Sequence, residues 1–509
     1  MANTINIPKT HLIMGLSLPL AVLIGYFLAE PLDLGSVAVV AGVLGVMSIP
    51  LLLRWYYPLL VFCWNSAISP FFLPARLTMG SLMSVIGLLL AVLTRAVNPK
   101  ARFVTVPSVT RPLLVLTAIV VGTGLMTGGF GVRSLGSAHF GGGKYFQLLT
   151  GVAGYFALTS RRIPPDRVGL YMAMFFLSGL GYAMANLAVL LGPPFHFLLN
   201  FFDPEVAMQQ MQAQGSLGGD IVRLNGFPAS AVAGYSFLLA RYGIRGLLDL
   251  KRPWRLLAFL SFCASGLYGG FRSYVGLLAI TLAVLFFLEG LHRTRYLPML
   301  LAGLLLGGVV ILPHAYKLPI VAQRAITFLP GRFDPFAVAN ASASVDWRLE
   351  MWRLVLPDVP RYFFHGKGYA FDPGDLYLAG QSANRFQADA LDPTIVAGEY
   401  HNGPLSLLIP FGIYGVIAFV WLLVAGGRTL HQNAKYGDPA CQNVNRLLLA
   451  TFTAHAVWFF TFFGALHSDL PMFLGLLGLG IALNGAEVVP IRAEEPQAAV
   501  EMNTEYVKA

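Results

Sequence analysis

A histidine with polar neighbours directly precedes a long apolar run. The motif is Glu399-Tyr400-His401-Asn402, and the apolar run extends from Gly403 to Gly426. Because the pKa of a neutral imidazole is near neutrality, His401 suits the removal of a proton from a hydroxyl nucleophile. The alternative is a structural role, in which His401 lies at an interface and Asn402 caps the helix that follows. The residues alone leave both roles open, with Glu399 and Asn402 as supporting groups.

Two arginines stand at the ends of apolar runs. Arg223 precedes the run 228–240, and Arg272 lies in the short turn between the runs 256–269 and 274–290. An unpaired guanidinium at a membrane interface is costly and usually marks function. Two neighbouring guanidinium forks can bind the oxygens of a diphosphate bidentately. The alternative is that each arginine extends to lipid headgroups at the membrane surface.

Further polar side chains are weaker candidates. Arg348 and Arg353 lie on the polar side of an expected helix, where ion pairs with Asp346 or Glu350 are the ordinary outcome. Asp469, in a turn near the C-terminus, is a candidate to face the same cavity. We therefore treat Arg348 and Asp469 as supporting residues only.

Several common catalytic motifs are absent from the sequence. It contains no phosphate-binding glycine loop, no His/Glu metal pair at helical spacing and no Asp-x-Asp pair. The three cysteines, Cys63, Cys263 and Cys441, are scattered and form no metal-binding or disulfide pattern. The sequence thus predicts chemistry without a metal ion or another cofactor.

The composition is that of a membrane protein. Of 509 residues, 56% are hydrophobic and only 11% are charged, whereas charged residues make up roughly 25% of soluble proteins. Apolar segments of about 17 to 25 residues cross a bilayer as helices. The sequence predicts an all-α polytopic protein with about 14 spans (a range of 12–14). Their expected positions are 12–29, 36–53, 57–73, 81–94, 113–127, 146–159, 170–191, 228–240, 256–269, 274–290, 297–312, 404–425, 447–465 and 470–484.

One polar segment, residues 314–402, interrupts these spans. It holds eight basic and nine acidic residues and is predicted to be a water-facing domain. Within it, the spacing of Trp347, Met351, Leu354 and Val355 predicts an amphipathic helix near 346–356. The flanking parts are expected to hold eleven spans (1–313), three spans (403–486) and a disordered cytoplasmic tail (487–509).

The charge distribution predicts the orientation of the spans. The net charge is +10, and the basic clusters fall on alternate loops, which is the positive-inside pattern. This pattern predicts two cytoplasmic termini and an extracytoplasmic 314–402 domain, and it excludes a nucleic-acid-binding surface. The first apolar run lacks a small-residue cleavage site, so we expect it to be retained as a span.

Taken in order, these motifs resemble the O-antigen ligase and O-antigen polymerase superfamily of bacterial membrane glycosyltransferases. The resemblance covers residues 220–425 and rests on Arg223-x-x-Gly226, Arg272, Arg348-x-x-x-Trp352, Gly366-x-Gly368, His401-Asn402 and Gly412-x-x-Gly415. The sequence departs from the family in having Phe271-Arg272-Ser273 where Ser-Arg-Gly is common. Arg223 to Gly234 fits the Arg-x10-Gly spacing described for polymerases, which hardly separates polymerase from ligase.

The resemblance implies a fold like that of C-type membrane glycosyltransferases in a bacterial inner membrane. It implies a polyprenyl-diphosphate-linked oligosaccharide as donor and a glycan or lipid-core acceptor, with membrane lipid and other polysaccharide-assembly proteins as further partners. On this reading His401 is the base, while Arg223 and Arg272 bind the diphosphate. The rival predictions are a flippase or other transporter of lipid-linked oligosaccharides, and a scaffold protein of the cell envelope.

Overall fold

The computed structural model describes residues 34–70, 77–98, 103–128, 142–215, 221–370 and 398–486, together with residues 22, 25 and 395. The chain divides into two compact units, residues 1–56 and 57–509. The packing described below lies within the second unit. The predicted tail 487–509 and most of the segment 371–397 lie outside the described residues.

Helices make up the fold, and the described residues contain no β-strand beyond an isolated bridge between Ile68 and Phe202. The all-α class is therefore confirmed. The α-helices are α2 Leu34–Trp64, α3 Met79–Val97, α4 Pro107–Thr127, α5 Gly142–Leu158, α6 Val168–Leu177, α7 Met184–Leu191, α8 Pro204–Gly215, α9 Gly226–Leu247, α10 Trp254–Gly266, α11 Arg272–Leu288, α12 Tyr296–Ile311, α13 Ile320–Ile326, α14 Pro335–Val355, α15 Asp358–Tyr362, α18 Gly403–Tyr436, α19 Gln442–Thr461 and α20 Leu466–Asn484. Short 3-10 helices join some of them: η3 Pro165–Arg167, η4 Ser178–Ala183, η5 Pro193–Asn200, η6 Leu267–Gly269, η7 Leu291–Arg293, η8 Leu312–Lys317 and η9 Pro439–Cys441.

Six helical segments in the described residues are long and apolar enough to cross a membrane. They are Met79–Val97, Pro107–Thr127, Pro165–Leu191, Tyr296–Lys317, Gly403–Tyr436 and Leu466–Asn484. These segments make the chain a membrane protein, whereas the count of about fourteen spans stays a prediction. One predicted boundary is wrong: α2 runs without a break through residues 54–56 and ends at Trp64, so 36–53 and 57–73 are not separate helices. The polar residues between those two runs are too few to end a helix.

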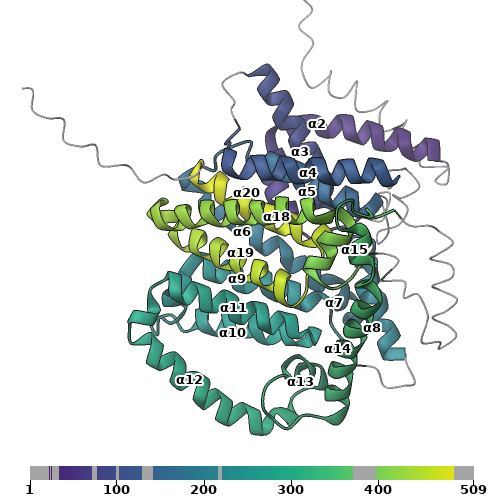
Figure 1. The fold of residues 1–509 in the computed structure, drawn as a ribbon. Helices are drawn as coiled ribbons and strands as arrows, with labels where there is room; N and C mark the ends of the chain where they lie inside the picture. The colour runs from purple at the N-terminus through teal and green to yellow at the C-terminus, as the bar shows by residue number, and fades with distance from the viewer. Residues whose placement is uncertain are drawn as a thin grey trace, which may run out of the picture. The chain divides into compact units, whose positions relative to one another are not determined.

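The core of the second unit is a set of packed helices around α18 and α20. Figure 1 shows α18, α19 and α20 beside one another, with α4 against α18 and α5 against α20. The run from Phe473 to Leu483 in α20 is buried throughout. A helix that is apolar on all sides belongs in the interior of a bundle, so α20 provides a rigid support for the elements at its ends.

The helix ends gather at two opposite ends of this unit. At one end, the Ile163 amide donates to the Ala482 carbonyl over 2.8 Å, and the Asn445 amide donates to the Asn484 side-chain oxygen over 3.0 Å. Two of the basic clusters predicted from the sequence, 161–167 and 241–255, lie in the connections at this end. The candidate site residues lie at the other end, near the first turns of α9, α11, α18 and α20.

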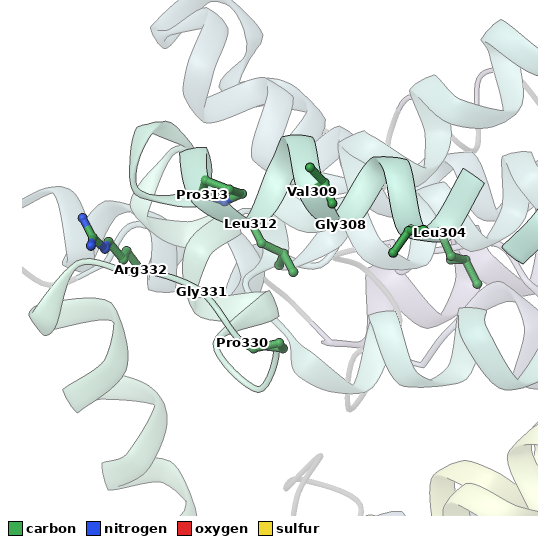
Figure 2. A pocket seen from close by; sticks show the side chains of 9 residues that line it. Leu304, Gly308, Val309, Leu312, Pro313, Pro330, Gly331 and Arg332 are labelled. Atoms are coloured by element: carbon green, nitrogen blue, oxygen red, sulfur yellow. The ribbon is translucent and has the colours of Figure 1, made fainter. Parts of the chain in front are cut away.

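Helix α12 differs from its neighbours because none of its side chains is buried. A pocket of about 680 Å³ lies between α12 and residues 330–332 (Figure 2). Its lining is almost wholly apolar: Leu304, Leu305, Gly308, Val309, Leu312, Pro313, Pro330, Gly331 and Arg332. Such an exposed apolar helix requires an apolar surrounding, which a lipid bilayer supplies.

Candidate functional site

His401 lies in a strained position between two aromatic rings. Its φ angle is 49°, in the left-handed region, where residues other than glycine are uncommon. The ring centroids of Trp347 and Phe463 lie 5.3 and 5.1 Å from that of His401. Asn402 caps α18 by accepting a hydrogen bond from the Leu405 amide over 3.1 Å. Backbone strain of this kind costs about 1–3 kcal/mol and persists only where the surroundings impose it.

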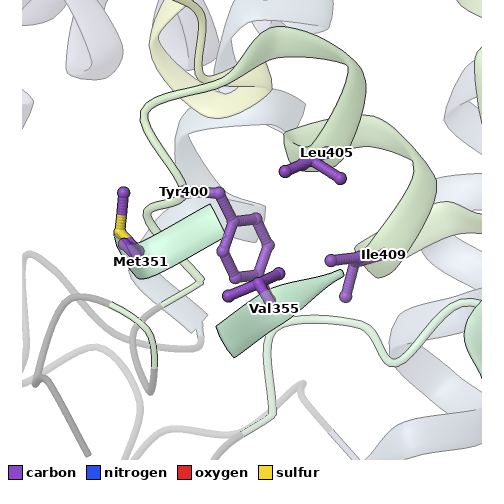
Figure 3. Close-up of a cluster of buried hydrophobic side chains, with 5 residues drawn as sticks. All are labelled: Met351, Val355, Tyr400, Leu405 and Ile409. Atoms are coloured by element: carbon purple, nitrogen blue, oxygen red, sulfur yellow. The ribbon is translucent and has the colours of Figure 1, made fainter. Parts of the chain in front are cut away.

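Helix α14 holds the segment that precedes His401. The indole nitrogen of Trp352 donates to the Tyr400 carbonyl over 2.8 Å. A cluster of buried side chains joins α14 to the first turns of α18 around Tyr400 (Figure 3): Met351, Val355, Tyr400, Leu405 and Ile409. The amphipathic helix expected near 346–356 thus lies in the second half of α14, with Met351 and Val355 facing this cluster.

A break in α18 receives part of the polar segment. Gly412 has φ 67° and ψ −173°, which no helix contains. The freed Ile413 amide donates to the Phe363 carbonyl over 2.7 Å, and the Lys367 amide donates to the Ile409 carbonyl over 2.8 Å. A broken helix is tolerated at membrane depth only where other groups satisfy its backbone. Residues 363–367 therefore fix the polar segment to α18 near its N-terminal end.

The two arginines predicted from the sequence lie around one turn. Gly270, with φ 67°, closes the turn before α11, which begins at Arg272. The Arg272 guanidinium donates to the Ala341 carbonyl of α14 over 2.9 Å. The Arg223 guanidinium carbon lies 5.9 Å from the ring centroid of Phe271, which is the N-cap residue of α11. Arg272 therefore directly follows this turn, and the side chain of Arg223 packs against it.

A third arginine, Arg324 of α13, lies in the same place and was not expected from the sequence. Its side chain is 5% exposed and donates to Asn340 Oδ1 over 2.6 Å, to Ser344 Oγ over 3.0 Å and to the Gly270 carbonyl. One feature of the sequence indicates that Arg324 is buried: of the seven residues of α13, only Gln323 and Arg324 are polar. Arg324 thus joins α13, α14 and the turn before α11.

Arg348 is the fourth arginine, and its surroundings differ from the expected ones. The exposed Arg353 does pair with Glu350, at 3.4 Å. Arg348 forms no ion pair with a carboxylate among the described residues. The expected ion pair with Asp346 or Glu350 is therefore wrong for Arg348. Its guanidinium carbon lies 5.8 Å from the Phe463 ring centroid, and its buried Nε has no hydrogen-bond partner in the described part of the chain.

The four guanidinium groups act on one another electrostatically. Burial, and then the charges of Arg223, Arg272 and Arg348, lower the pKa of Arg324 to about 10. Burial and the charge of Arg272 lower the pKa of Arg348 as well. Within the ranges that the structure describes, no carboxylate pairs with Arg272, Arg324 or Arg348. Guanidinium forks of this kind match the geometry of phosphate oxygens.

Glu399 pairs with a lysine and, among the described residues, with none of Arg272, Arg324 and Arg348. It pairs with the fully buried Lys144 of α5 at 3.5 Å. The Lys144 ammonium also lies 5.3 Å from the ring centroid of Tyr369. Glu399 therefore ties the segment before His401 to α5.

Asp469 serves its own helix. Its carboxylate accepts a hydrogen bond from the Ala465 amide over 2.8 Å at the start of α20. A first-turn carboxylate that accepts from the amide of the N-cap residue resembles the return bond of a capping box. Asp469 is thus bound to the backbone at the start of α20 and does not join the arginine cluster in this structure.

The fold and the site define an all-helical membrane protein with a cluster of arginines beside a histidine. Residues 256–420 match a family model, Wzy_C, described as O-antigen ligase. The resemblance to the O-antigen ligase and polymerase superfamily is thereby confirmed, and the matched segment includes Arg272, Arg324, Arg348 and His401. Arg223, Lys144 and Asp469 lie outside it. No curated protein matches the chain.

Proposed function

We propose that this protein is a membrane glycosyltransferase that transfers or polymerises a glycan from a polyprenyl-diphosphate donor onto an acceptor hydroxyl. The observation that carries the proposal is the arrangement of Arg272, Arg324 and Arg348 beside His401, with no carboxylate paired to these arginines in the described ranges. The family model over residues 256–420 supports glycan transfer of this kind. The product is an O-antigen or an exopolysaccharide, made by a polymerase or by a ligase.

The reaction is a direct displacement at the anomeric carbon of the donor. His401 takes the proton of the acceptor hydroxyl as its oxygen attacks that carbon. The bond from the anomeric carbon to the diphosphate oxygen breaks, and polyprenyl diphosphate leaves with the electron pair. Direct displacement inverts the configuration at this carbon.

The arginine cluster stabilises the departing diphosphate. Fixed positive charge placed where negative charge develops is a large contribution to catalysis, because the groups need no reorganisation. Arg223 and Arg272 bind the diphosphate, as the resemblance implies, and Arg324 and Arg348 add to the same charge. Guanidinium groups supply this charge without a divalent metal ion.

The remaining candidates position these groups. Asn402 caps α18 directly after His401, and Glu399 holds the preceding segment through Lys144. The contacts of Trp347 and Phe463 with the His401 ring fix its plane. Asp469 supports the start of α20. This helix begins shortly after Phe463, whose ring contacts both His401 and Arg348.

The protein would lie in a bacterial inner membrane with both termini in the cytoplasm. Residues 314–402 would then form an extracytoplasmic domain that covers the site. The lipid chain of the donor needs an apolar path to the arginines. Helix α12 leads through η8 to α13, which carries Arg324, and the apolar pocket beside α12 offers such a path (Figure 2).

The rival candidate is a transporter that moves the same lipid-linked glycan across the membrane. Transporters bind their substrates near the middle of the membrane, whereas these arginines lie at the ends of α9 and α11 and in α13 and α14. A scaffold protein would need neither the arginines nor the histidine.

Deletion of the gene distinguishes the two activities. Loss of a transferase should leave lipid-linked glycan at the outer face, where an impermeant glycosidase cleaves it in spheroplasts. Loss of a flippase should leave the glycolipid at the inner face, protected until the membrane is opened. Protected glycolipid in the deletion strain would reject the proposed function.

A further inference from the structure

A second cavity lies at the same end of the helix bundle as His401. Its volume is about 280 Å³, and it lies among the end of α2 and the first turns of α3, α5 and α20. The residues that matter for its chemistry are Trp64, Asn65, Ser81, Gln147, Thr150 and His467. None of the residues that line this cavity lies within the segment 256–420 that matches the family model.

The lining offers neutral hydrogen-bonding groups. It contains hydroxyls, carboxamides, an imidazole and aromatic rings, and no Lys, Arg, Asp or Glu. Asn65 donates from Nδ2 to the Phe175 carbonyl over 2.9 Å, which leaves its Oδ1 to accept a hydrogen bond. No hydrogen bond of the Gln147 side chain occurs in the described residues. A few such groups beside aromatic surface are what fixes the orientation of a small polar ligand.

The cavity wall is rigid because Trp64 fits between two helices. Its indole occupies the space that side chains at Gly154 of α5 and Gly475 of α20 would otherwise fill. The hydroxyl groups of Ser84 and Thr150 donate hydrogen bonds to backbone carbonyls of their own helices, over 2.8 and 3.1 Å. Their oxygens therefore keep fixed positions as acceptors toward a ligand.

A short series of contacts connects the cavity to the arginine and histidine site. The ring centroid of His467, which lines the cavity, lies 6.3 Å from that of Tyr369. Tyr369 lies under the ammonium of Lys144, which pairs with Glu399 two residues before His401. Gln147 follows Lys144 by less than one helical turn. Packed side chains therefore connect the wall of this cavity to the segment that holds His401.

We propose that this cavity binds an uncharged sugar unit of a glycan substrate. The volume lies just below the range of about 300–1,000 Å³ for small-molecule sites, which suits one or two sugar units and not a lipid chain. The absence of charged residues from the lining favours a neutral sugar over a uronic acid. The proposal deepens the proposed function and rests on it, since the glycan belongs either to the donor or to the acceptor.

Sugar binding is measured directly, without turnover, by saturation-transfer NMR on the full-length protein in lipid nanodiscs. The probes are the methyl glycosides of glucose, galactose and N-acetylglucosamine, with glucuronate as the charged counterpart. The variants are Gln147→Ala, which removes a side chain without a hydrogen bond in the described residues, and the double variant Gln147→Ala/Thr150→Val. Thr117→Val is the matched control, because Thr117 of α4 makes the same kind of bond to its own helix, over 2.7 Å to Leu113.

We expect at least one neutral glycoside to bind the wild-type protein, Thr117→Val and His401→Gln alike, and more tightly than glucuronate. Both cavity variants should bind it at least tenfold more weakly. Absence of binding to the wild-type protein, or equal affinity in the cavity variants, would overturn the proposal. Gln147→Ala alone decides the matter if the double variant does not fold.

Transfer kinetics then identify which glycan occupies the cavity. A raised KM for the donor in the cavity variants assigns the sugar to the donor, and a raised KM for the acceptor assigns it to the acceptor. Unchanged values for both would contradict a role in this reaction. If the wild-type protein transfers no glycan at all, the proposed function fails, while the binding measurements still decide whether the cavity is a sugar site.

Discussion

Arg348 and His401 lie against the same aromatic ring. The guanidinium carbon of Arg348 is 5.8 Å from the centroid of Phe463, and the imidazole centroid of His401 is 5.1 Å from it. Phe463 lies in the short connection between α19 and α20, so two helices fix the ring that both side chains contact. The proposed base and the proposed diphosphate site are thus held by one support, as a concerted displacement requires.

The guanidinium groups should not be replaceable by ammonium groups. Arg272→Lys and Arg324→Lys keep the charge but lose the fork that binds two phosphate oxygens. We expect each to lower kcat/KM more than tenfold, which corresponds to about 1.4 kcal/mol or more. Arg353→Lys is the control, because Arg353 is exposed and pairs only with Glu350, and it should stay near wild-type activity. Near-normal transfer by both site variants would place the diphosphate elsewhere.

Inorganic pyrophosphate should stabilise the folded protein. The pKa of Arg324 is lowered to about 10 by burial and by the other arginines, so below pH 10 its charge opposes folding. A bound anion offsets this repulsion and should raise the melting temperature at pH 7–8 progressively with the anion concentration L, because the stabilisation grows as RT ln(1 + L/Kd). The shift should be smaller in Arg324→Gln, and sulfate at the same ionic strength should give less of it. An equal shift in both proteins would remove Arg324 from the anion site.

His401, Arg223 and Arg272 could be chosen from the sequence because each stands at the border of an apolar run, and Arg348 because it lies on a recognisable helix. Their roles stay predictions. Arg324 was not predicted because its neighbours in the sequence form no motif. Only the tertiary packing of α13 brings its side chain to Gly270. The boundary expected between residues 53 and 57 was wrong, because α2 continues through this stretch although Pro50 and Pro58 lie on either side of it.

The pairing of Glu399 also depended on distant residues. Lys144 lies 255 positions earlier in the chain, at the start of α5, where a lone basic residue gave no hint of its partner. The role of Asn402 as an N-cap follows from local geometry, since a polar residue before an apolar run is the usual signal for one. Asp469 acts from inside the first turn of α20, on the amide of Ala465.

The Lys144–Glu399 pair should affect turnover through the position of His401. Lys144→Met leaves Glu399 without this partner, and we expect only a small loss of stability, because Glu399 is 27% exposed to water and the mutation also removes a charge that is costly to bury. The value of kcat should fall while the KM for the donor changes little. Arg353→Met, which breaks an exposed pair, is the control. A change confined to the donor KM would show that Lys144 acts on binding and not on the base.

The α14 segment and the α18–α19 connection should face opposite sides of the membrane. Cysteines at Ser342 and Ala440, both at exposed positions, should differ in intact cells, with an impermeant thiol reagent labelling only position 342. The chain without added cysteines gives the background, because Cys63 and Cys441 are buried. Labelling at position 440 alone would reverse the orientation on which the proposed function depends. Labelling at both positions would reject the predicted difference between the two sides.

The most direct measurement of the central claim is glycan transfer by purified His401→Gln enzyme with a defined polyprenyl-diphosphate donor and a defined acceptor. Glutamine can still form a hydrogen bond with the acceptor hydroxyl but cannot take its proton near neutral pH. We predict that transfer falls by about 10² to 10⁴-fold, the usual contribution of a general base, while donor affinity, which the arginines supply, stays within a few-fold of wild type. Transfer at the wild-type rate would contradict the account and leave His401 as a positioning residue.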